Sequence, residues 1–531
     1  MSAQGLTVYI QPYPEHKHKV FVTTNIGFIG LAGMLNHFIV KKQELNRMTG
    51  MSYVKEYRIY TKHKNGVLLG KGYLDLFITL ASLAGISIQF TNSEHFTRPI
   101  LSINDKWREI LSNPDRIVEG KTQLENLTTA LDYSGLGFLK FVTGYGKTEL
   151  QIALLSSYLQ SHDGNVMIMV PTSVIADNFV ERLNRWGEEQ VGVNGEKVGK
   201  YKNDFNPAHR VNIVNPTGFL RRKNVGEGLE WMKSVGLILA DEAHHLSADS
   251  WMKVVDHCNN VDYLYGFSGT PATERHLAPT LDSIILDGSS PKDWTPNLAQ
   301  AMSITGLVKT NVSGEHLDSK KVKIEILTGK YSNIPDSDKG HYTLALDHAL
   351  MSPVLARHIS LYLRENLDRT FFFIIHKKEA GRTLRRLLLE CGGFQEDEIC
   401  VLEAKYYEPD TLKTTEDLKR HLDTGRVRLL ISTSVGMEGF DSSAISGCFL
   451  TAGKNVRYAL QVLGRSRAED SLAVFVKDQG NPIVIRQAKE KISIVKSEFG
   501  TNVVSEKTYK CPPEFTRVET QDDETEPDLP W

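Results

Sequence analysis

Three things are scarce in this sequence: paired cysteines, long apolar runs and an excess of charge of one sign. The five cysteines are scattered and include no Cys-x-x-Cys pair, which argues against a zinc module and favours a reducing compartment. The longest apolar candidate, 74–86, is interrupted by Asp75 and is too short to span a bilayer. The run 6–10 ends at Gln11-Pro12 before it could form the apolar core of a signal peptide. We therefore expect a cytoplasmic protein without membrane contact.

The bulk composition is typical of a globular protein, with 41% hydrophobic and 24% charged residues in a chain of 531. This length is enough for about three or four domains. The net charge of −2 excludes a globally basic nucleic-acid binder but is compatible with a local basic surface. Local motifs, rather than composition, must therefore indicate the function.

The first segment, 1–105, carries no nucleotide motif, and its pattern predicts a small α+β domain. Its predicted elements are a helix at 74–83 and strands at 6–10, 19–23, 57–61 and 86–90. Up to Lys71 the segment is basic, and tyrosines are interleaved with its lysines and arginines. Such a stretch suits a surface that follows a nucleic-acid backbone, although it also fits the solvated face of an ordinary small domain.

Two further segments, 106–315 and 316–500, alternate buried-looking strands with helical stretches. The first has predicted strands at 138–142, 166–170, 211–214, 237–240 and 263–268. The second has predicted strands at 322–326, 370–375, 399–402, 427–431, 447–450 and 473–476. Strands that alternate with helices imply parallel sheets with helices on both faces, so we predict an α/β fold with two such lobes. Ligands of these folds bind at the carboxyl ends of the strands.

The last segment, 501–531, differs from the rest of the chain in composition. It ends in a stretch without apolar periodicity that is crowded with acidic residues, namely Asp522, Asp523, Glu524, Glu526 and Asp528. Such composition predicts a disordered acidic tail.

The first motif is a glycine-rich turn in the segment 106–315. Thr143-Gly144-Tyr145-Gly146-Lys147-Thr148 follows the apolar run 138–142. Glycines let backbone N–H groups approach phosphates, a lysine neutralises the β- and γ-phosphate charge, and a threonine hydroxyl reaches Mg²⁺. The sequence therefore predicts that Lys147 is catalytic, that Thr148 binds the metal, and that all six residues bind the nucleotide.

The second motif, Asp241-Glu242-Ala243-His244, follows the apolar run 235–240. Asp241 would hold Mg²⁺ through water, and Glu242 would orient and deprotonate the attacking water. Either motif alone is a weak signal, because both glycine turns and acidic helix starts are common. Together, in this order and each after a buried strand, they predict hydrolysis of a nucleoside triphosphate.

Four more motifs complete the series in a recognisable order. They are Val170-Pro171-Thr172, Ser268-Gly269-Thr270 and, in the segment 316–500, the pair Thr433 to Asp441 and Gln461 to Arg467. With the two nucleotide motifs, this series resembles the superfamily 2 helicases and translocases over residues 120–470. Within that superfamily it resembles the UvsW-type phage branch-migration helicases, the XPB-like repair helicases and the restriction motors. The resemblance implies two tandem RecA-like lobes, preceded here by the small α+β accessory domain.

For the first lobe, the resemblance implies binding of ATP and Mg²⁺ and several residue roles. Thr172 would hold phosphates of the tracked strand, although a threonine before a helix is also a good cap. His244, Ser268 and Thr270 would couple hydrolysis to lobe movement, and Gln123 would read the adenine. Two positions depart from the family pattern. Phe141 stands where the full P-loop has glycine, and Asn178 stands where the family usually has glutamine.

For the second lobe, the resemblance implies groups that complete the site from the other side of a cleft. Thr433 would bind the tracked strand, and Gly439 and Asp441 would contact the nucleotide. Gln461, Arg465 and Arg467 lie in a motif similar to the arginine-finger motif, in which an arginine stabilises transition-state charge. The family's second arginine usually comes three residues after the first, where this chain has Ala468, so both arginines stay candidates.

The expected function is that of an ATP-dependent DNA helicase or translocase. Its partner would be single-stranded, forked or branched DNA in replication, recombination or repair, and a phage-encoded member would work in the host cytoplasm. Two alternatives stay open: a DEAH/DExH-type RNA helicase, and an ATP-dependent assembly factor that does not unwind. The second is motivated by Glu526–Trp531, which is similar in composition to the tails of single-stranded-DNA-binding and phage replication proteins. A purely solubilising tail would look the same.

Overall fold

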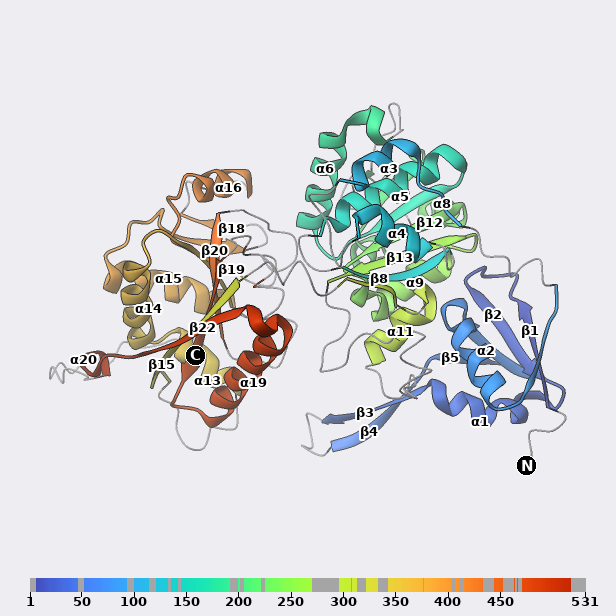
Figure 1. Cartoon of the computed structure of the whole chain (residues 1–531), viewed down its shortest axis with the longest axis horizontal. Coiled ribbons are helices and arrows are strands. Elements are labelled where there is room, and N and C mark those ends of the chain that lie inside the picture. Colours follow the sequence, from blue (N-terminus) through green and yellow to red (C-terminus); the bar gives the residue numbers. More distant parts are fainter. Residues whose placement is uncertain are drawn as a thin grey trace. The chain divides into compact units, whose positions relative to one another are not determined.

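The computed structural model divides the chain into two compact units, residues 1–318 and 319–531 (Figure 1). In the first unit it describes 6–45, 52–92, 100–113, 121–131, 135–141, 145–191, 199–200, 205–220, 225–269, 296–306 and 308–312. In the second unit it describes 321–332, 342–375, 377–403, 406–409, 412, 415–432, 444–451, 463, 466 and 470–516.

The N-terminal part of the first unit contains a five-stranded sheet in the order β5-β6-β2-β1-β7. Its strands are β1 (Thr7–Pro12), β2 (Lys19–Thr24), β5 (Tyr60–His63), β6 (Gly66–Gly70) and β7 (Ser87–Phe90). β1 and β7 are parallel and the other pairs are antiparallel. The short helices η1 (Gly27–Leu31), α1 (Ala32–Leu35), η2 (Asn36–Phe38) and η3 (Lys71–Tyr73) and the longer α2 (Leu74–Leu83) complete this part. The predicted helix at 74–83 and the α+β class are confirmed.

The predicted strand at 57–61 is wrong, because the chain changes sheets at Ile59. Residues before it form β4 (Ser52–Arg58), which pairs with β3 (Ile39–Leu45) in a separate two-stranded ribbon. Residues after it form β5 and pair with β6. The backbone N–H of Ile59 donates to the carbonyl oxygen of Phe38 at 3.0 Å, at the point where the ribbon ends.

The rest of the first unit is built on a seven-stranded sheet in the order β10-β11-β9-β12-β13-β8-β14. Every neighbouring pair is parallel. The strands are β8 (Leu136–Phe141), β9 (Asn165–Met169), β10 (Gly199–Lys200), β11 (Val211–Val214), β12 (Val235–Asp241), β13 (Tyr263–Ser268) and β14 (Val308–Val312). β11, β12 and β13 are buried at every residue, as expected for strands covered on both faces. The predicted parallel sheet is confirmed.

Helices cover this sheet and connect its strands. They are α3 (Asp105–Leu111), α4 (Gln123–Leu131), α5 (Lys147–Ser161), α6 (Ser173–Val191), α7 (Pro216–Leu220), α8 (Val225–Lys233), η6 (Ala243–Ser247), α9 (Asp249–His257) and α11 (Pro296–Thr305). Figure 1 shows helices in front of and around the strands of this lobe. α5 follows β8 directly after the phosphate loop, so the sheet positions the start of that helix.

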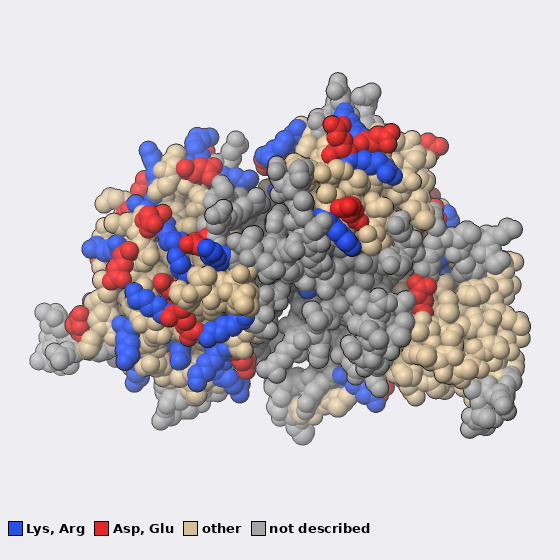
Figure 2. Space-filling model, viewed as in Figure 1, with Lys and Arg blue, Asp and Glu red and all other residues tan. Residues whose placement is uncertain are grey.

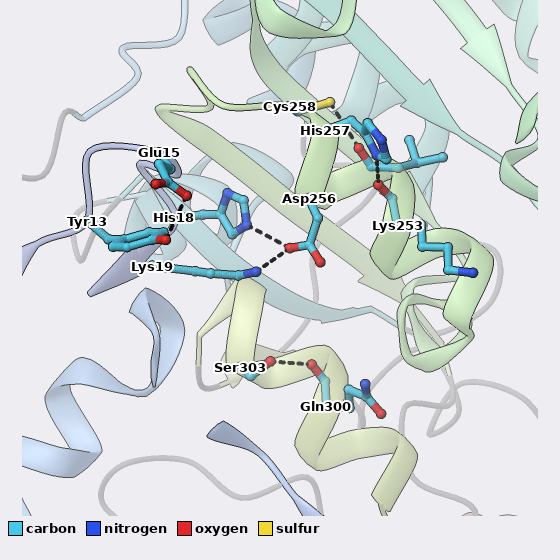
Figure 3. A network of polar contacts seen from close by, with 11 residues as sticks. Tyr13, Glu15, His18, Lys19, Lys253, Asp256, His257, Cys258, Gln300 and Ser303 are labelled. Carbon is cyan, nitrogen blue, oxygen red and sulfur yellow. Dashed lines mark hydrogen bonds and ion pairs between the residues drawn. The ribbon is translucent and has the colours of Figure 1, made fainter. Parts of the chain in front are cut away.

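The N-terminal sheet is attached to the seven-stranded lobe by a polar contact at the end of α9 (Figure 3). The Nζ of Lys19 donates to Asp256 Oδ1 at 2.5 Å, and Nε2 of the buried His18 lies 3.4 Å from the same oxygen. Burial disfavours the charged form of Asp256, but hydrogen bonds from His18 and Lys19 outweigh it and lower the pKa of this carboxyl to about 2. The Nζ of Lys17 bonds Asp262 at 3.0 Å. The two parts of the first unit are therefore joined by paired charges.

A second attachment joins η3 to α11 through close backbone approach. The Tyr73 hydroxyl, which is fully buried, donates to the carbonyl oxygen of Ala299. A Cβ at Gly72 would lie 2.3 Å from the backbone nitrogen of Gly306 and 2.4 Å from the Met302 oxygen. Only glycine fits here without moving backbone.

The second unit contains an eight-stranded sheet in the order β18-β17-β19-β16-β20-β21-β15-β22. Its strands are β15 (Lys321–Gly329), β16 (Thr370–Ile374), β17 (Ile399–Glu403), β18 (Tyr406–Glu408), β19 (Leu429–Ser432), β20 (Ile445–Leu450), β21 (Asp470–Asp478) and β22 (Val503–Lys510). All neighbours are parallel except β17 and β18. Its helices are α13 (Tyr342–Leu350), α14 (Pro353–Glu365), α15 (Lys378–Gly392), α16 (Thr415–Asp423), α19 (Pro482–Phe499), η9 (Gly500–Asn502) and α20 (Pro513–Thr516). This second α/β lobe is confirmed.

The predicted tail, 501–531, is wrong in its first part. Val503–Lys510 form the edge strand β22, which pairs with β15 along its length. The exposure of most β22 residues removes the apolar signal from the sequence, and the backbone ladder with β15 supplies the pairing instead. Residues 517–531 lie outside the described part of the chain. Within that part, no helix has the length and apolar character needed to cross a bilayer.

We expect Gly72→Ala to lower the free energy of unfolding by about 1–3 kcal/mol, because the added methyl would meet backbone atoms of α11 that cannot move alone. Gly33→Ala is the matched control, since no atom lies within 4 Å of a Cβ built there. The control should be neutral or slightly stabilising. Urea unfolding followed by fluorescence measures both, and equal midpoints for the two variants would contradict the close approach.

Candidate nucleotide site

The phosphate loop ends in a glycine whose backbone conformation suits no other residue well. Gly146 has φ +90° and directly precedes α5, which begins at Lys147. Left-handed backbone favours glycine, and the exposed N–H groups at a helix start form a ready site for phosphate. Of the predicted loop, Tyr145 to Thr148 are described, and Thr143 and Gly144 lie outside the described residues.

The loop is held by aromatic stacking and by two amides of α4. The Tyr145 ring stacks on Phe141 with 5.0 Å between centroids, so the residue that replaces glycine in the P-loop pattern has a packing role. Asn126 Nδ2 donates to the Tyr145 hydroxyl at 3.0 Å. Gln123 Nε2 donates to the Tyr145 carbonyl oxygen at 2.5 Å. Gln123 therefore positions the loop backbone in this structure, and its adenine-reading role stays a prediction.

The predicted metal ligand Asp241 lies at the end of β12, beside α5. Its side chain is buried, and its Oδ1 accepts a hydrogen bond from Gln151 Nε2 at 3.1 Å. Gln151 lies one helical turn after Lys147, whose Nζ donates to the Phe141 carbonyl oxygen at 3.4 Å. Gln151 is not among the residues that the sequence predicts. Its only signal is the spacing of four from Lys147, which places both on one face of α5.

Burial and the neighbouring Glu242 raise the pKa of Asp241 to about 6, and the Lys147 charge opposes this shift. Two carboxyl groups at one buried turn with a single lysine nearby leave negative charge that a divalent cation would neutralise. No group of three or more His, Cys, Asp or Glu side chains suited to a metal occurs among the described residues. Mg²⁺ commonly uses one or two carboxylates and the phosphates of its nucleotide, so Asp241 and Thr148 fit as its protein ligands.

Glu242 occupies a strained backbone position directly after Asp241. Its φ of +49° is left-handed, which is uncommon outside glycine and often marks a functional turn. His244 Nδ1 lies 3.3 Å from Glu242 Oε2 and 3.2 Å from the Ser268 hydroxyl at the end of β13. Glu242 and His244 of one predicted motif and Ser268 of another are therefore brought together. Thr270 lies outside the described residues.

The Pro-Thr motif lies at the neighbouring strand end. The Thr172 hydroxyl accepts a hydrogen bond from the backbone N–H of Ile175 at 3.4 Å, which caps the first turn of α6. Asn215, after β11, donates to the Pro171 carbonyl oxygen at 2.5 Å and so fixes this turn. Asn215 is a further residue that the sequence does not predict. The nucleic-acid role of Thr172 stays a prediction beside its observed cap.

The predicted residues of the second unit lie outside the described part of the chain. These are Thr433, Gly439, Asp441, Gln461, Arg465 and Arg467. The neighbouring Ser432 is the last residue of β19, a parallel strand of the second sheet. The roles of these residues stay predictions.

Comparisons with known proteins agree with the nucleotide motifs. The family model described as type III restriction enzyme, res subunit, matches residues 118–273. The ATP-dependent DNA helicase uvsW of Enterobacteria phage T4 is 30% identical over 138 residues, which are 25% of this chain and 26% of that protein. This chain is thus matched over about a quarter of the curated relative's length.

Solved structures are similar at lower identity. The crystal structure of T4 UvsW is 13% identical with a TM-score of 0.41, covering 95% of this chain and all of that one. The helicase MrfA bound to DNA and AMPPNP is 15% identical with a TM-score of 0.49, covering 78% of this chain and 55% of that one. Dbp5 of S. cerevisiae bound to RNA and ADP BeF3 is 14% identical with a TM-score of 0.47, covering 78% and 95%.

Three observations define a helicase-type nucleotide-binding lobe. They are the P-loop after β8, the Asp-Glu turn after β12 and the family match over 118–273. The chain has two α/β lobes preceded by a small N-terminal domain. Its similarity to the res-subunit family over residues 118–273, and to the UvsW helicase of phage T4 over 138 residues, is that expected of a superfamily 2 helicase or translocase.

Asp241→Asn should stabilise the nucleotide-free protein at pH 7.5 by about 1–3 kcal/mol, because the raised pKa means that ionising this carboxyl opposes folding. Between about pH 4 and 6 the folded protein binds more protons than the unfolded chain, so wild-type stability falls as pH rises through that window. Below pH 4 the Asp241 carboxyl is protonated in both the folded and the unfolded wild-type protein, so the wild type and the variant should have matching stabilities. Thermal unfolding in EDTA from pH 4 to 8 measures this; an advantage that does not change with pH would contradict the assignment.

Proposed function

We propose that the protein is an ATP hydrolase that moves along or unwinds DNA. The observation that carries this proposal is the bridge from Gln151 to Asp241, which joins the helix of the phosphate loop to the strand of the Asp-Glu turn. This bridge supports the proposal that Lys147 and Asp241, 94 positions apart in the sequence, serve one site at the carboxyl edge of one sheet.

The described side chains suit phosphoryl transfer to water. Lys147 would bind the β- and γ-phosphates, and the start of α5 would donate backbone N–H groups to them. Glu242 would orient the attacking water and accept its proton, with His244 restraining the carboxylate. Mg²⁺, held by Thr148 and Asp241, would neutralise charge that develops on the phosphates. Arg465 or Arg467 of the second lobe would stabilise the transition state as the arginine finger.

The DNA substrate is proposed from similarity and from charge. The curated relative is an ATP-dependent DNA helicase, and this chain matches it over 138 residues. The N-terminal segment is basic and rich in tyrosine up to Lys71, which suits contact with a nucleic-acid backbone. We propose forked or branched DNA, in phage replication, recombination or repair, as the substrate class. Stimulation of ATP hydrolysis by forked DNA more than by structured RNA of equal length would separate this from an RNA helicase.

The acidic end, Glu526–Trp531, is proposed to bind a replication protein, with Trp531 filling an apolar pocket and the acids meeting lysines or arginines around it. Deleting 525–531 should leave ATP hydrolysis unchanged and weaken capture of a single-stranded-DNA-binding partner in a pull-down. Equal capture with and without the segment would leave only a solubilising role.

Glu242→Gln should bind ATP but hydrolyse it at least about 100-fold more slowly, because the amide cannot accept the proton of the attacking water.

Lys147→Ala should abolish turnover by weakening phosphate binding while largely keeping DNA binding. Steady-state phosphate release and binding of a fluorescent ATP analogue distinguish the two losses. Lys233→Ala is the control, since the ion pair that the described residues give this exposed lysine is a local one, with Glu230. Near-normal turnover of Glu242→Gln would exclude Glu242 as the base.

A further inference from the structure

One polar side chain interrupts the buried apolar part of α5. The run 150–155 is apolar except for Gln151, and this glutamine has no exposed surface. A buried amide costs free energy unless its donors and its acceptor find partners. An apolar residue would fill the position without that cost, so packing alone does not explain the glutamine.

The amide of Gln151 is hydrogen-bonded to Asp241 through its nitrogen. Its Nε2 donates to Asp241 Oδ1 at 3.1 Å, between residues that are 90 positions apart in the sequence. Its Oε1 is buried and accepts no hydrogen bond from any residue that the structure describes. A pair that served only the fold would gain stability by avoiding a buried acceptor without a donor. A ligand that carries hydrogen-bond donors would supply what Oε1 lacks.

This amide lies between the two nucleotide motifs. Lys147 precedes Gln151 by one turn of α5, and Asp241 contacts Gln151 from the end of β12. Asp241 and Thr148 are the residues that fit as protein ligands of Mg²⁺. This ion uses only one or two carboxylates and keeps several of its waters. Those waters are hydrogen-bond donors, and Oε1 is an acceptor at the same place.

The visible surface charge does not offer Mg²⁺ a competing site. On the face shown in Figure 2, the acidic side chains of the described residues lie among lysines and arginines. Opposite charges side by side cancel much of each other's attraction for a free ion. Mg²⁺ that strengthens nucleotide binding is therefore expected to act at Asp241.

We propose that Gln151 is a positioning residue of the magnesium site. Its Nε2 orients the Asp241 carboxylate toward the ion, and its Oε1 accepts a hydrogen bond from water in the hydration shell of the ion. Partners behind a metal ligand fix its direction, and the loss of such a partner typically lowers metal affinity about 10–100-fold. This inference deepens the proposed function and rests on it, because Mg²⁺ enters the site with the nucleotide.

Gln151→Leu tests the proposal, since leucine fills the buried position without an amide. A fluorescent, non-hydrolysable ATP analogue is titrated into the protein in EDTA and in saturating Mg²⁺. The ratio of the two affinities measures how much more tightly the bound nucleotide holds Mg²⁺ than the free nucleotide does. The ratio should fall about 10–100-fold in Gln151→Leu, while the affinity in EDTA should stay nearly unchanged.

Two further variants make the result specific. Gln160→Leu is the matched control, because this glutamine lies near the end of the same helix and is exposed. It should keep the wild-type ratio. Gln151→Met has a side chain of similar length without a donor, so it should behave as Gln151→Leu does even where leucine disturbs the start of α5. The unfolding midpoint in EDTA, measured for each variant, identifies such a disturbance.

A double variant tests whether Gln151 acts through Asp241. Adding Gln151→Leu to Asp241→Asn should lower the ratio little beyond the effect of Asp241→Asn alone, because the amide then has no carboxylate to orient. Fully additive losses would overturn the proposal. So would a wild-type ratio in Gln151→Leu and Gln151→Met, or equal losses of affinity in EDTA and in Mg²⁺.

The wild-type protein separates this inference from the proposed function. A wild type that neither binds the analogue nor hydrolyses ATP would remove the proposed function, and this inference with it. A wild type that does both, beside a Gln151→Leu variant with an unchanged ratio, would remove the role of Gln151 alone.

Discussion

The two nucleotide motifs of the first lobe are joined through a buried carboxyl group at the end of a parallel strand. Asp241 has lost most of its water, and the Gln151 amide replaces one hydrogen bond of that water. This contact is possible only because β12 ends at the edge of the sheet where α5 begins. The strands β9, β13 and β8 also end at this edge. The order of the strands therefore sets the distance between the two nucleotide motifs, and no local feature of either motif could do so.

The packing of the N-terminal part is connected to the packing around the Asp-Glu turn. η3 approaches α11 at Gly72, and α11 packs against η6, the helix that follows the Asp-Glu turn. A Cβ at Gly266 would meet the Ala243 side chain at 2.7 Å and the Thr305 methyl at 3.1 Å, so β13, η6 and α11 are packed without spare room. In so dense an interior a shift of α11 cannot leave the turn after Glu242 unchanged. Ligand binding by the N-terminal part and the shape of the nucleotide site are therefore coupled, and the packing of α11 couples them.

Much of this fold was predictable, because buried parallel strands appear in the sequence as continuous apolar runs. β11, β12 and β13 are such runs, and the phosphate loop and the Asp-Glu turn follow theirs directly. The first part of the ribbon strand β4, 52–56, and the edge strand β22 were not predictable, since exposed strands carry no apolar face and depend on their partners. Gln151 and Asn215 were missed for a different reason: each binds a group far away in the sequence, and a single amide has no local signature. The division of 57–61 between two sheets likewise depends on a backbone bond to Phe38.

The Asp-Glu turn concentrates two unfavourable features in adjacent residues. Asp241 is a buried acid whose ionisation is opposed by its neighbour, and Glu242 holds a left-handed backbone that costs of order 1–3 kcal/mol in a residue other than glycine. Neither feature improves stability, since an asparagine at 241 would fill nearly the same space without a charge, and a glycine at 242 would adopt the left-handed backbone without strain. Left-handed backbone at Glu242 does change where its carboxylate points, and His244 meets it there while also contacting the Ser268 hydroxyl. A turn that keeps both costs side by side loses stability but places two carboxyl groups next to each other, as the proposed roles of Asp241 and Glu242 in nucleotide hydrolysis require.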